Sequence, residues 1–299
     1  MNVRAQIRML PDGRRLHLQD GPIDLVVEAF GAGAAVTVAY NTAWRRFATV
    51  LDELCGELAF LRQECCAENE WPSGAVARRM TAAVMPYASQ SFITPMAAVA
   101  GAVAEEILQA MTGVAELDRA YVNNGGDIAL HLSPGEKFVV GMVERPDHRS
   151  LFGTLTIDGS QPVRGIATSG WRGRSFSLGI ADAVTVLADH AAAADAAATI
   201  LANAVDLPGH AKIVRVPASE LAPDSDLGER LVTQAVGELA AHEIEEALAA
   251  GCRVAELLRR MGLIRAAALC LKGETRVVGA ASRSIVNTES IGERNLVHA

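Results

Sequence analysis

The order in which two hydrophobic periodicities follow one another constrains the fold of this chain more than any other feature. Alternating apolar and polar residues over the first thirty positions, interrupted by a turn at residues 11–13, predict strands. Apolar residues at three- and four-residue spacing from about 41 to 68 predict a helix, and two further helices are predicted over 75–88 and 95–111. Strands and helices thus come in runs, which favours α+β layers over a doubly wound parallel sheet.

The second half of the chain continues this pattern. Between residues 119 and 188, short segments separated by turn-forming residues predict six strands: AYVNN, DIALHL, KFVVGMV, GTLTI, RGIAT and SFSLGI. A helix over 191–205, a strand over 211–216, helices over 227–249 and 254–260, and a hairpin over 267–280 follow. We expect one α+β domain over residues 1–281, built as one unit or as two interleaved lobes, and a polar, disordered tail over 282–299. The apolar helices after residue 218 are expected to complete the core or an interface of a homo-oligomer.

The charge balance narrows the range of partners. The chain has 27 Lys and Arg against 35 Asp and Glu, a formal net charge of −8, which is the wrong sign for a protein whose main partner is a phosphate backbone. Its only lysines are Lys137, Lys212 and Lys272, and none of them ends a glycine-rich run. Nucleic acid is therefore disfavoured as a partner, and a Walker-type NTPase is excluded.

The cysteine content and the hydropathy of the chain are typical of a cytoplasmic protein. The five cysteines show no C-x-x-C spacing and no nearby histidine, so we expect neither a zinc site nor a disulfide framework. No apolar leader and no uncharged apolar stretch of membrane-spanning length is visible. We therefore expect a cytoplasmic protein without a membrane partner.

Two familiar functional motifs are incomplete in this chain, and a third is absent. The run GAGAAV at 31–36 has Val36 where a dinucleotide-binding fingerprint needs its third glycine, so a turn between a strand and a helix is the better interpretation. His242 and Glu243 begin like a zinc-protease motif, but Glu246 stands where the second histidine would be. A G-x-S-x-G nucleophile elbow is absent.

A glycine-rich turn is the first of three polar segments that indicate a binding site. Residues 122–127, VNNGGD, place two glycines between predicted strands. Adjacent glycines let the backbone N–H groups approach an anion, while neighbouring Asn and Asp side chains can hydrogen-bond a heteroaromatic ring or a ribose. Taken alone, the segment is better explained as a tight hairpin, since Asn-Gly is a strong type I′ turn signal.

The second polar segment follows the next predicted strand end. Thr168, Ser169 and Gly170 lead into a loop that contains Arg172 and Arg174. Two hydroxyls, a glycine and two guanidinium groups so close together could hold a pyrophosphate, because guanidinium–phosphate hydrogen bonds are strong and bidentate. Taken alone, the segment is better explained as an exposed Ser/Gly/Arg loop.

The third segment is the alanine-rich helix over 191–205. Asp195 and Thr199 are four residues apart and therefore lie on one helix face. A carboxylate and a hydroxyl are hard oxygen ligands of the kind that Mg²⁺ accepts alongside phosphates and water. Alternatively, the threonine bonds a helix carbonyl and the aspartate caps or stays solvated. Because alanines surround the pair, two polar groups on this face need a partner or they cost stability.

In this order and spacing, the three segments resemble the ApbE family of flavin transferases. NNGGDI (123–128) resembles the family's N-x-G-G-D turn, IATSG (166–170) its T-S-G strand end, and ADAVTVLADHAAAADAAAT (181–199) its V-T-V strand and A-D-A-x-A-T helix. TPMAAVAGAVAEEIL (94–108) resembles the helix that precedes them. The resemblance covers roughly residues 90–205, and the run SFITPMAAVAGAV is closest to the uncharacterised UPF0280 branch.

The resemblance implies a fold, a ligand and a set of site residues. The fold is α+β, with antiparallel and mixed sheets of the T-fold type packed with helices around a central cleft. The family binds FAD with Mg²⁺ and moves the FMN half onto a threonine or serine of a target protein, so a nucleotide ligand (FAD or FMN) and a protein acceptor are implied. Asp195, Thr199 and a backbone carbonyl near Ala98 match the metal ligands. The residues on the flavin side are Asn124, Gly125, Gly126, Asp127, Thr168, Ser169 and Gly170, to which we add Arg172 and Arg174 as phosphate contacts.

Two departures from the family pattern leave the chemistry open. Ala100 stands where the family has a lysine before the helix glycine, and Leu178 stands where it has a histidine. A transfer that needs a base at that point would lose a contribution of about 10²–10⁴ in rate, and we assign no catalytic residue. The alternatives are a non-catalytic flavin-binding or partner protein, and a hydrolase or transferase that acts on another small molecule in the same cleft.

Overall fold

A nine-stranded antiparallel sheet is the centre of the fold. The structure is a computed structural model that describes residues 4–68, 70–145, 148–279 and 296–298. Within these ranges the strands lie in the order β1-β2-β3-β4-β5-β8-β9-β12-β13, so neighbours in the sequence are mostly neighbours in the sheet. Their bounds are β1 (Gln6–Met9), β2 (Leu16–Asp20), β3 (Ile23–Phe30), β4 (Arg119–Asn124), β5 (Asp127–Leu132), β8 (Gly165–Ser169), β9 (Ala183–Ala188), β12 (Ala266–Leu271) and β13 (Glu274–Gly279).

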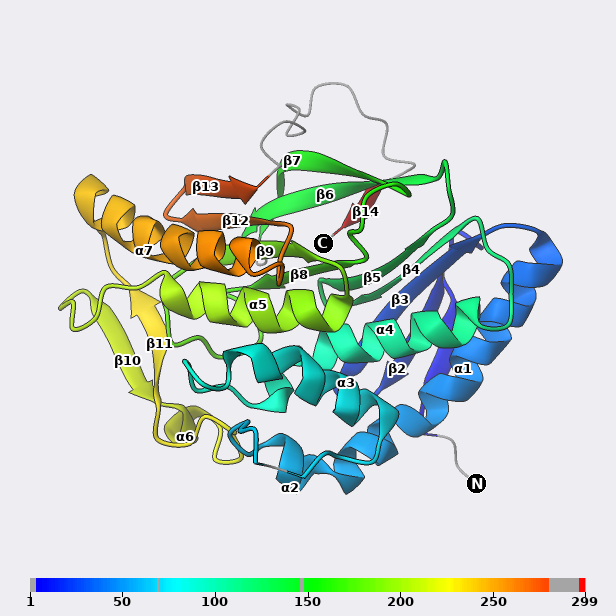
Figure 1. Ribbon diagram of the computed structural model, residues 1–299, viewed down its shortest axis with the longest axis horizontal. Coiled ribbons are helices and arrows are strands. Elements are labelled where there is room, and N and C mark those ends of the chain that lie inside the picture. Colours follow the sequence, from blue (N-terminus) through cyan, green and yellow to red (C-terminus); the bar gives the residue numbers. More distant parts are fainter. Residues whose placement is uncertain (1–3, 69, 146–147, 280–295, 299) are drawn as a thin grey trace.

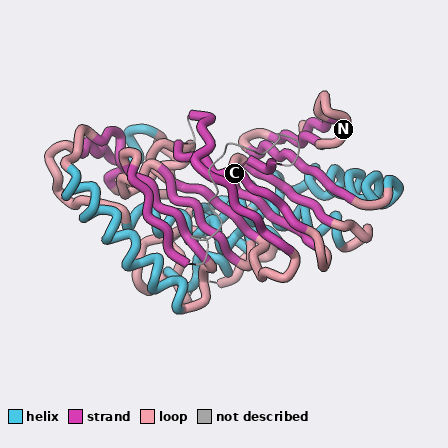
Figure 2. Tube along the Cα trace, turned by 90° about the horizontal axis from the view of Figure 1, so that it is seen from above, coloured by secondary structure: helices cyan, strands magenta, loops and turns pink. Residues whose placement is uncertain are grey.

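Helices cover one face of this sheet (Figures 1 and 2). The long helices are α1 (Gly33–Gly56), α3 (Ala75–Val84), α4 (Val99–Thr112), α5 (Ala191–Ala204) and α7 (Ala241–Arg260), and the short ones are α2 (Leu58–Leu61), α6 (Ala218–Leu221), η1 (Met85–Tyr87) and η2 (Pro95–Ala98). Helices α4 and α5 pack against the middle strands and against each other. The side chains between the sheet and the helices form the larger hydrophobic core, with Phe47, Met80 and Leu201 among its fully buried members.

Small residues set the distance between α4 and α5. A Cβ added at Gly101 would lie 2.3 Å from the carbonyl oxygen of Ala191, so only glycine fits at this contact. Nine residues of α5 are buried, and seven of them are alanines. The alanine-rich composition of the chain is thus used to bring two helices and the sheet close together.

A second, smaller sheet packs on the opposite face. It contains β6 (Lys137–Arg145), β7 (His148–Asp158) and β14 (Leu296–His298), with β14 parallel to β6 (Figure 1). Phe138 makes edge-to-face contacts with Phe30 at 6.2 Å and with Tyr121 at 5.9 Å between ring centroids. A separate hydrophobic cluster therefore joins this sheet to the middle of the large one.

A two-stranded arm lies beyond the end of α5. Strand β10 (Ile213–Pro217) pairs antiparallel with β11 (Leu231–Val236), and α6 lies between them in the chain (Figure 1). The loop after α6 returns to the body of the protein at residues 225–227, next to the cleft described below. In the described part of the chain, no helix is both long and apolar enough to cross a membrane.

The α+β class is confirmed, while several expected elements differ. The expected helix over 227–249 is wrong in its first part, because Val232 and Thr233 pair with β10 as strand β11. One continuous helix, α7, then replaces the two that were expected. Helix α1 begins at Gly33, inside the segment expected to be a turn. Of the tail expected to be disordered, residues 282–295 and 299 lie outside the described residues, whereas Leu296–His298 form β14.

The segment SFSLGI at 175–180 is a loop and not the expected strand. Its backbone groups bond to the end of α5 and to the arm in place of a neighbouring sheet strand. The N–H of Ile180 donates to the carbonyl of Val205 at 2.8 Å, and the carbonyl of Ser177 accepts from the N–H of Thr233 at 2.8 Å. Alternation of side chains alone could not reveal these partners.

Candidate functional site

One cleft brings the three polar segments together. It has a volume of about 870 Å³, within the usual range of small-molecule sites. The turn between β4 and β5, the end of β8 and one face of α5 supply its polar lining. Of the residues predicted to bind ligand or metal, those that line the cleft are Gly125, Gly126, Asp127, Thr168, Ser169, Gly170, Arg174, Asp195 and Thr199.

The turn between β4 and β5 is both a hairpin turn and a wall of the cleft. Gly125 and Gly126 have φ angles of +67° and +113°, conformations that favour glycine. The N–H of Gly126 donates to Oδ1 of Asn123 at 2.8 Å, which fixes the turn. Asn124, predicted to face the ligand, is buried and does not line the cleft; its Nδ2 donates to the carbonyl of Ala100 at 3.1 Å and ties the turn to α4.

Asp127 and Asp195 form the electrostatic centre of the cleft. Oδ1 of Asp127 accepts from the N–H of Thr168 at 3.2 Å, and Oδ2 of Asp195 accepts from the N–H of Gly101, in the first turn of α4, at 2.9 Å. Loss of solvent raises the pKa of Asp127 to about 7. The pKa of Asp195 is raised well above its ordinary value, first by burial and then by the charge of Asp127.

This electrostatic arrangement favours a bound cation. Two negative charges that repel each other in a partly desolvated site are stabilised when a cation neutralises both. Thr199 lies one helical turn beyond Asp195 and adds a hydroxyl to the same wall. Carboxylate and hydroxyl oxygens of this kind suit Mg²⁺ when phosphate oxygens and water complete its coordination. The described residues contain no cluster of three or more His, Cys, Asp or Glu that would hold a metal by itself.

Ala98, predicted as a backbone ligand, lies behind the cleft wall. Its side chain is fully buried, and the lining in this region comes from its neighbours Ala97, Val99 and Ala100. It lies where η2 ends and α4 begins. The segment expected near the metal thus does reach the cleft, although Ala98 itself is not among the lining residues.

The two loop arginines point to different places. Nε of Arg172 donates to Oδ1 of Asp182 at 2.7 Å, and its guanidinium stacks 4.4 Å from the ring centre of Trp171. Buried Asp182 also accepts from the indole N–H of Trp171 at 3.1 Å and from the N–H of Lys272 at 2.6 Å. Arg172 therefore holds the loop and does not line the cleft, whereas exposed Arg174 does.

The cleft is predominantly acidic. Among the described residues that line it, Asp24, Asp127, Asp195 and Asp226 are carboxylates and Arg174 is the single cation. Asp24 is 3.0 Å from Nε2 of His17, and Asp226 accepts a hydrogen bond from the hydroxyl of Thr94. An anionic ligand would be repelled by the remaining carboxylates unless a metal ion accompanied it.

Several lining residues were missed by the sequence analysis. Thr94 and Asp226 meet across 132 positions of sequence, and no local pattern announces such a contact. Phe92 and Met96 line the cleft beside Thr94. Asn203 continues the face of Asp195 and Thr199 by another four residues, so the same helical spacing, carried one step further, would have found it.

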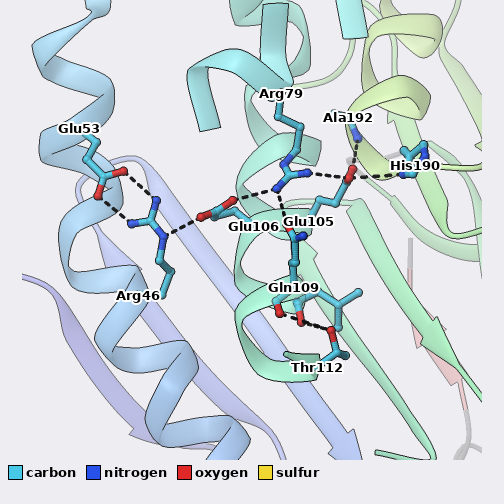
Figure 3. Close-up of polar contacts among 10 residues, drawn as sticks. Arg46, Glu53, Arg79, Glu105, Glu106, Gln109, Thr112, His190 and Ala192 are labelled. Carbon is cyan, nitrogen blue, oxygen red and sulfur yellow. Dashed lines mark hydrogen bonds and ion pairs between the residues drawn. The ribbon is translucent and has the colours of Figure 1, made fainter. Parts of the chain in front are cut away.

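A charged network fixes the position of α5 relative to its neighbours (Figure 3). Arg79 of α3 binds Glu105 at 3.0 Å and Glu106 at 2.9 Å, both on α4. Oε2 of Glu105 in turn accepts from the N–H of Ala192, in the first turn of α5, at 3.3 Å. His190 lies 3.4 Å from Glu105, which raises the pKa of the imidazole. The network ends three residues before Asp195.

Comparison with known proteins places the chain in a family. A family model described as AbpE bacteria matches residues 7–277. The chain belongs to this family. The expected resemblance to ApbE-like proteins is thereby confirmed.

The relatives of this AbpE-family chain include UPF0280 proteins. One from Methanopyrus kandleri is 40% identical over 129 residues, 43% of this chain and 48% of that protein. Another, from Methanothrix thermoacetophila, is 42% identical over 123 residues, 40% of this chain and 50% of that protein. The chain thus spans about half the length of the curated relatives it matches, and over that part the expected similarity to UPF0280 proteins is confirmed.

Two solved structures align with the AbpE-family chain over nearly its whole length. The apo flavinyl transferase ApbE of Pseudomonas stutzeri is 12% identical, with a TM-score of 0.44 over 95% of this chain and 98% of that one. A mutant of the flavin transferase ApbE from Vibrio cholerae is 12% identical, with a TM-score of 0.47 over 94% of this chain and 99% of that one.

The two departures from the family pattern both face the cleft of this AbpE-family chain. Leu178 and Ala100 line it, so the apolar side chains stand in the site itself. No histidine is among the described residues that line the cleft. The titratable groups available there are the four aspartates and Arg174.

Proposed function

We propose that the cleft binds a flavin nucleotide, FAD or FMN, together with Mg²⁺. The observation that carries the proposal is the pairing of Asp127 and Asp195, two carboxylates with raised pKa values in a cleft that also presents Thr199 and Arg174. A cation would neutralise the two carboxylates, and phosphate oxygens together with water would complete the coordination of the cation. Family membership supports a flavin as that ligand.

Different residues of the cleft would contact the metal and the phosphate. Asp195 and Thr199 would hold the metal from α5, with Asp127 facing them from β5. Arg174 would contact a phosphate, because a guanidinium donates paired hydrogen bonds to phosphate oxygens. When bound, Mg²⁺ would neutralise charge on the phosphate oxygens. The 870 Å³ of the cleft is enough for a ligand of dinucleotide size.

If the chain also transfers FMN, the acceptor is a protein hydroxyl and AMP is released from FAD. The bond that forms joins the hydroxyl oxygen to the FMN phosphorus, the pyrophosphate bond breaks, and the hydroxyl proton leaves to a base. Among the described residues that line the cleft, the four aspartates are the groups that could accept that proton, because no histidine lies there. Leu178, in place of the family's histidine, favours the second candidate, a flavin-binding protein without turnover.

Flavin fluorescence tests the binding proposal. Titrating the protein into FAD with Mg²⁺ should quench the flavin emission, and Asp195→Ala should abolish the effect. Asp189→Ala is the matched control: it also removes one aspartate, but Asp189 pairs with Arg265 at the surface and does not line the cleft. If the wild-type protein does not quench the flavin emission, or if both variants lose the quenching, the assignment is refuted. AMP release in the presence of a candidate acceptor decides between transfer and binding alone.

A further inference from the structure

The side-chain amide of Asn203 has a fixed orientation. Its Oδ1 accepts from the N–H of Leu178 at 2.9 Å and from the hydroxyl of Ser177 at 3.2 Å. A backbone N–H can only donate, so the atom of the Asn203 amide that faces the N–H of Leu178 must be the oxygen. The hydroxyl of Ser177 itself accepts from the N–H of Gly179 at 3.2 Å, which leaves its proton for Asn203. The amide cannot flip without setting donors against donors.

The orientation leaves the Nδ2 group of Asn203 for a ligand. Asn203 lines the cleft, and its Nδ2 has no hydrogen-bond acceptor among the described residues. A donor held in place by two other hydrogen bonds loses little freedom when it binds a ligand, so it discriminates well between acceptors and other groups.

The position of Asn203 along α5 indicates which part of a ligand it meets. Asp195, Thr199 and Asn203 follow one another at four-residue intervals along one helix face. At a rise of 1.5 Å per residue, Asn203 is roughly 12 Å along the helix from Asp195. Phosphate oxygens bound to a metal at Asp195 would not reach that far.

The surroundings of Asn203 differ from those of Asp195. Leu178, whose backbone holds the amide, and Phe176 in the same loop both line the cleft. A single amide donor beside apolar side chains suits the edge of a planar heteroaromatic ring, which offers a hydrogen-bond acceptor next to an apolar face. The carboxylates and Arg174 at the turn between β4 and β5 suit phosphate and metal instead.

We propose that Asn203 is a specificity-determining residue whose Nδ2 donates to an acceptor atom on a ring of the bound nucleotide. This inference rests on the proposed function and extends it to the base or flavin ring. Both ring systems of FAD carry acceptors of this kind on their edges. FMN contains the flavin ring and ADP contains the adenine ring, so comparing the two ligands shows which ring Asn203 contacts.

Isothermal titration with FAD, FMN and ADP, each with Mg²⁺, tests the inference. Asn203→Asp keeps an oxygen toward Leu178 and Ser177 and replaces the donor with an acceptor, and Asn203→Ala removes the donor without adding charge. Both variants should bind FAD about tenfold more weakly or worse. Either FMN or ADP should lose affinity to the same degree while the other keeps its wild-type affinity with Asn203→Ala.

The outcomes separate this inference from the function on which it rests. Wild-type affinity of both variants for all three ligands would overturn the role of Asn203 and leave flavin binding in place. Equal weakening of FMN and ADP by Asn203→Ala would also overturn it, because the residue would then act on the shape of the cleft. If the wild-type protein binds none of the three ligands, the proposed function fails and this inference fails with it.

Discussion

The guanidinium of Arg174 occupies the space that a side chain on Gly125 would need. A Cβ added at Gly125 would lie 1.9 Å from Nη2 of Arg174. The missing side chain in the turn between β4 and β5 thus lets Arg174, a cation of the cleft lining, lie beside Asp127. Gly125 is therefore needed both for the turn and for the position of Arg174.

Gly125→Ala should therefore weaken ligand binding by displacing Arg174. The variant should lose about 1 kcal/mol of stability from the positive φ angle and roughly tenfold in FAD affinity from the lost guanidinium contact. The double variant with Arg174→Ala should bind no more weakly than Arg174→Ala alone, as titration calorimetry can measure. Additive losses in the double variant would show that the two residues act independently.

Asp127→Asn should stabilise the metal-free protein, and more so at higher pH. The folded-state pKa of Asp127, about 7, lies above the ordinary 3.8, so the folded state binds more protons between these values. Stability from this group is therefore present at low pH and lost as the pH rises from about 4 to 7. In buffer with EDTA, the difference in melting temperature between variant and wild type should be small at pH 4 and level off above pH 7. A difference that shrinks with rising pH would contradict this.

Gly101→Ala should destabilise the protein through the contact between α4 and α5. The added Cβ would lie 2.3 Å from a backbone carbonyl, which cannot move away as a side chain could. We expect a loss of about 2 kcal/mol in chemical denaturation. Gly33→Ala is the control, since Gly33 is also helical and nothing lies within 4 Å of its added Cβ. Equal effects of the two substitutions would mean that helix propensity, and not packing, is responsible.

Arg79→Met should be costly because it leaves two half-buried carboxylates without their shared partner. Glu105 and Glu106 are 18% and 13% exposed, so solvent compensates them only in part, and their remaining partners are His190 at 3.4 Å from Glu105 and Arg46 at 2.7 Å from Glu106. We expect a loss of about 2 kcal/mol in the free energy of unfolding. Arg259→Met breaks an exposed pair with Glu256 on α7 and should change stability by less than about 0.5 kcal/mol. A small effect of Arg79→Met would show that the network in Figure 3 is not important for stability.

The sequence alone predicts much of the fold because the apolar positions repeat with clear periods. The strands over the first thirty residues and α4 are recognisable in this way. The loop over 175–180 has the same alternation as a strand, yet its backbone partners are Asn203, Val205 and Thr233. Hydrogen bonds to such distant groups leave no periodic signal, so the sequence predicts a strand where the structure has a loop.

The candidate site could be predicted where polar residues interrupt an apolar context. Asp195 and Thr199 stand out among alanines, and the turn at 124–127 stands out by its glycines. The sequence could not show that Arg172 is held by Asp182 while Arg174 is free of it. Nor could it bring Thr94 to Asp226, since that contact depends on the return of the arm toward η2.

Calorimetric titration of FAD into the wild-type protein, with Mg²⁺ and again with EDTA, tests the central claim most directly. If Asp127 and Asp195 need a cation before an anionic ligand can bind, FAD should bind in the micromolar range with Mg²⁺ and at least about tenfold more weakly without it. Equal affinity under both conditions, or no binding at high micromolar FAD with Mg²⁺, would contradict the account.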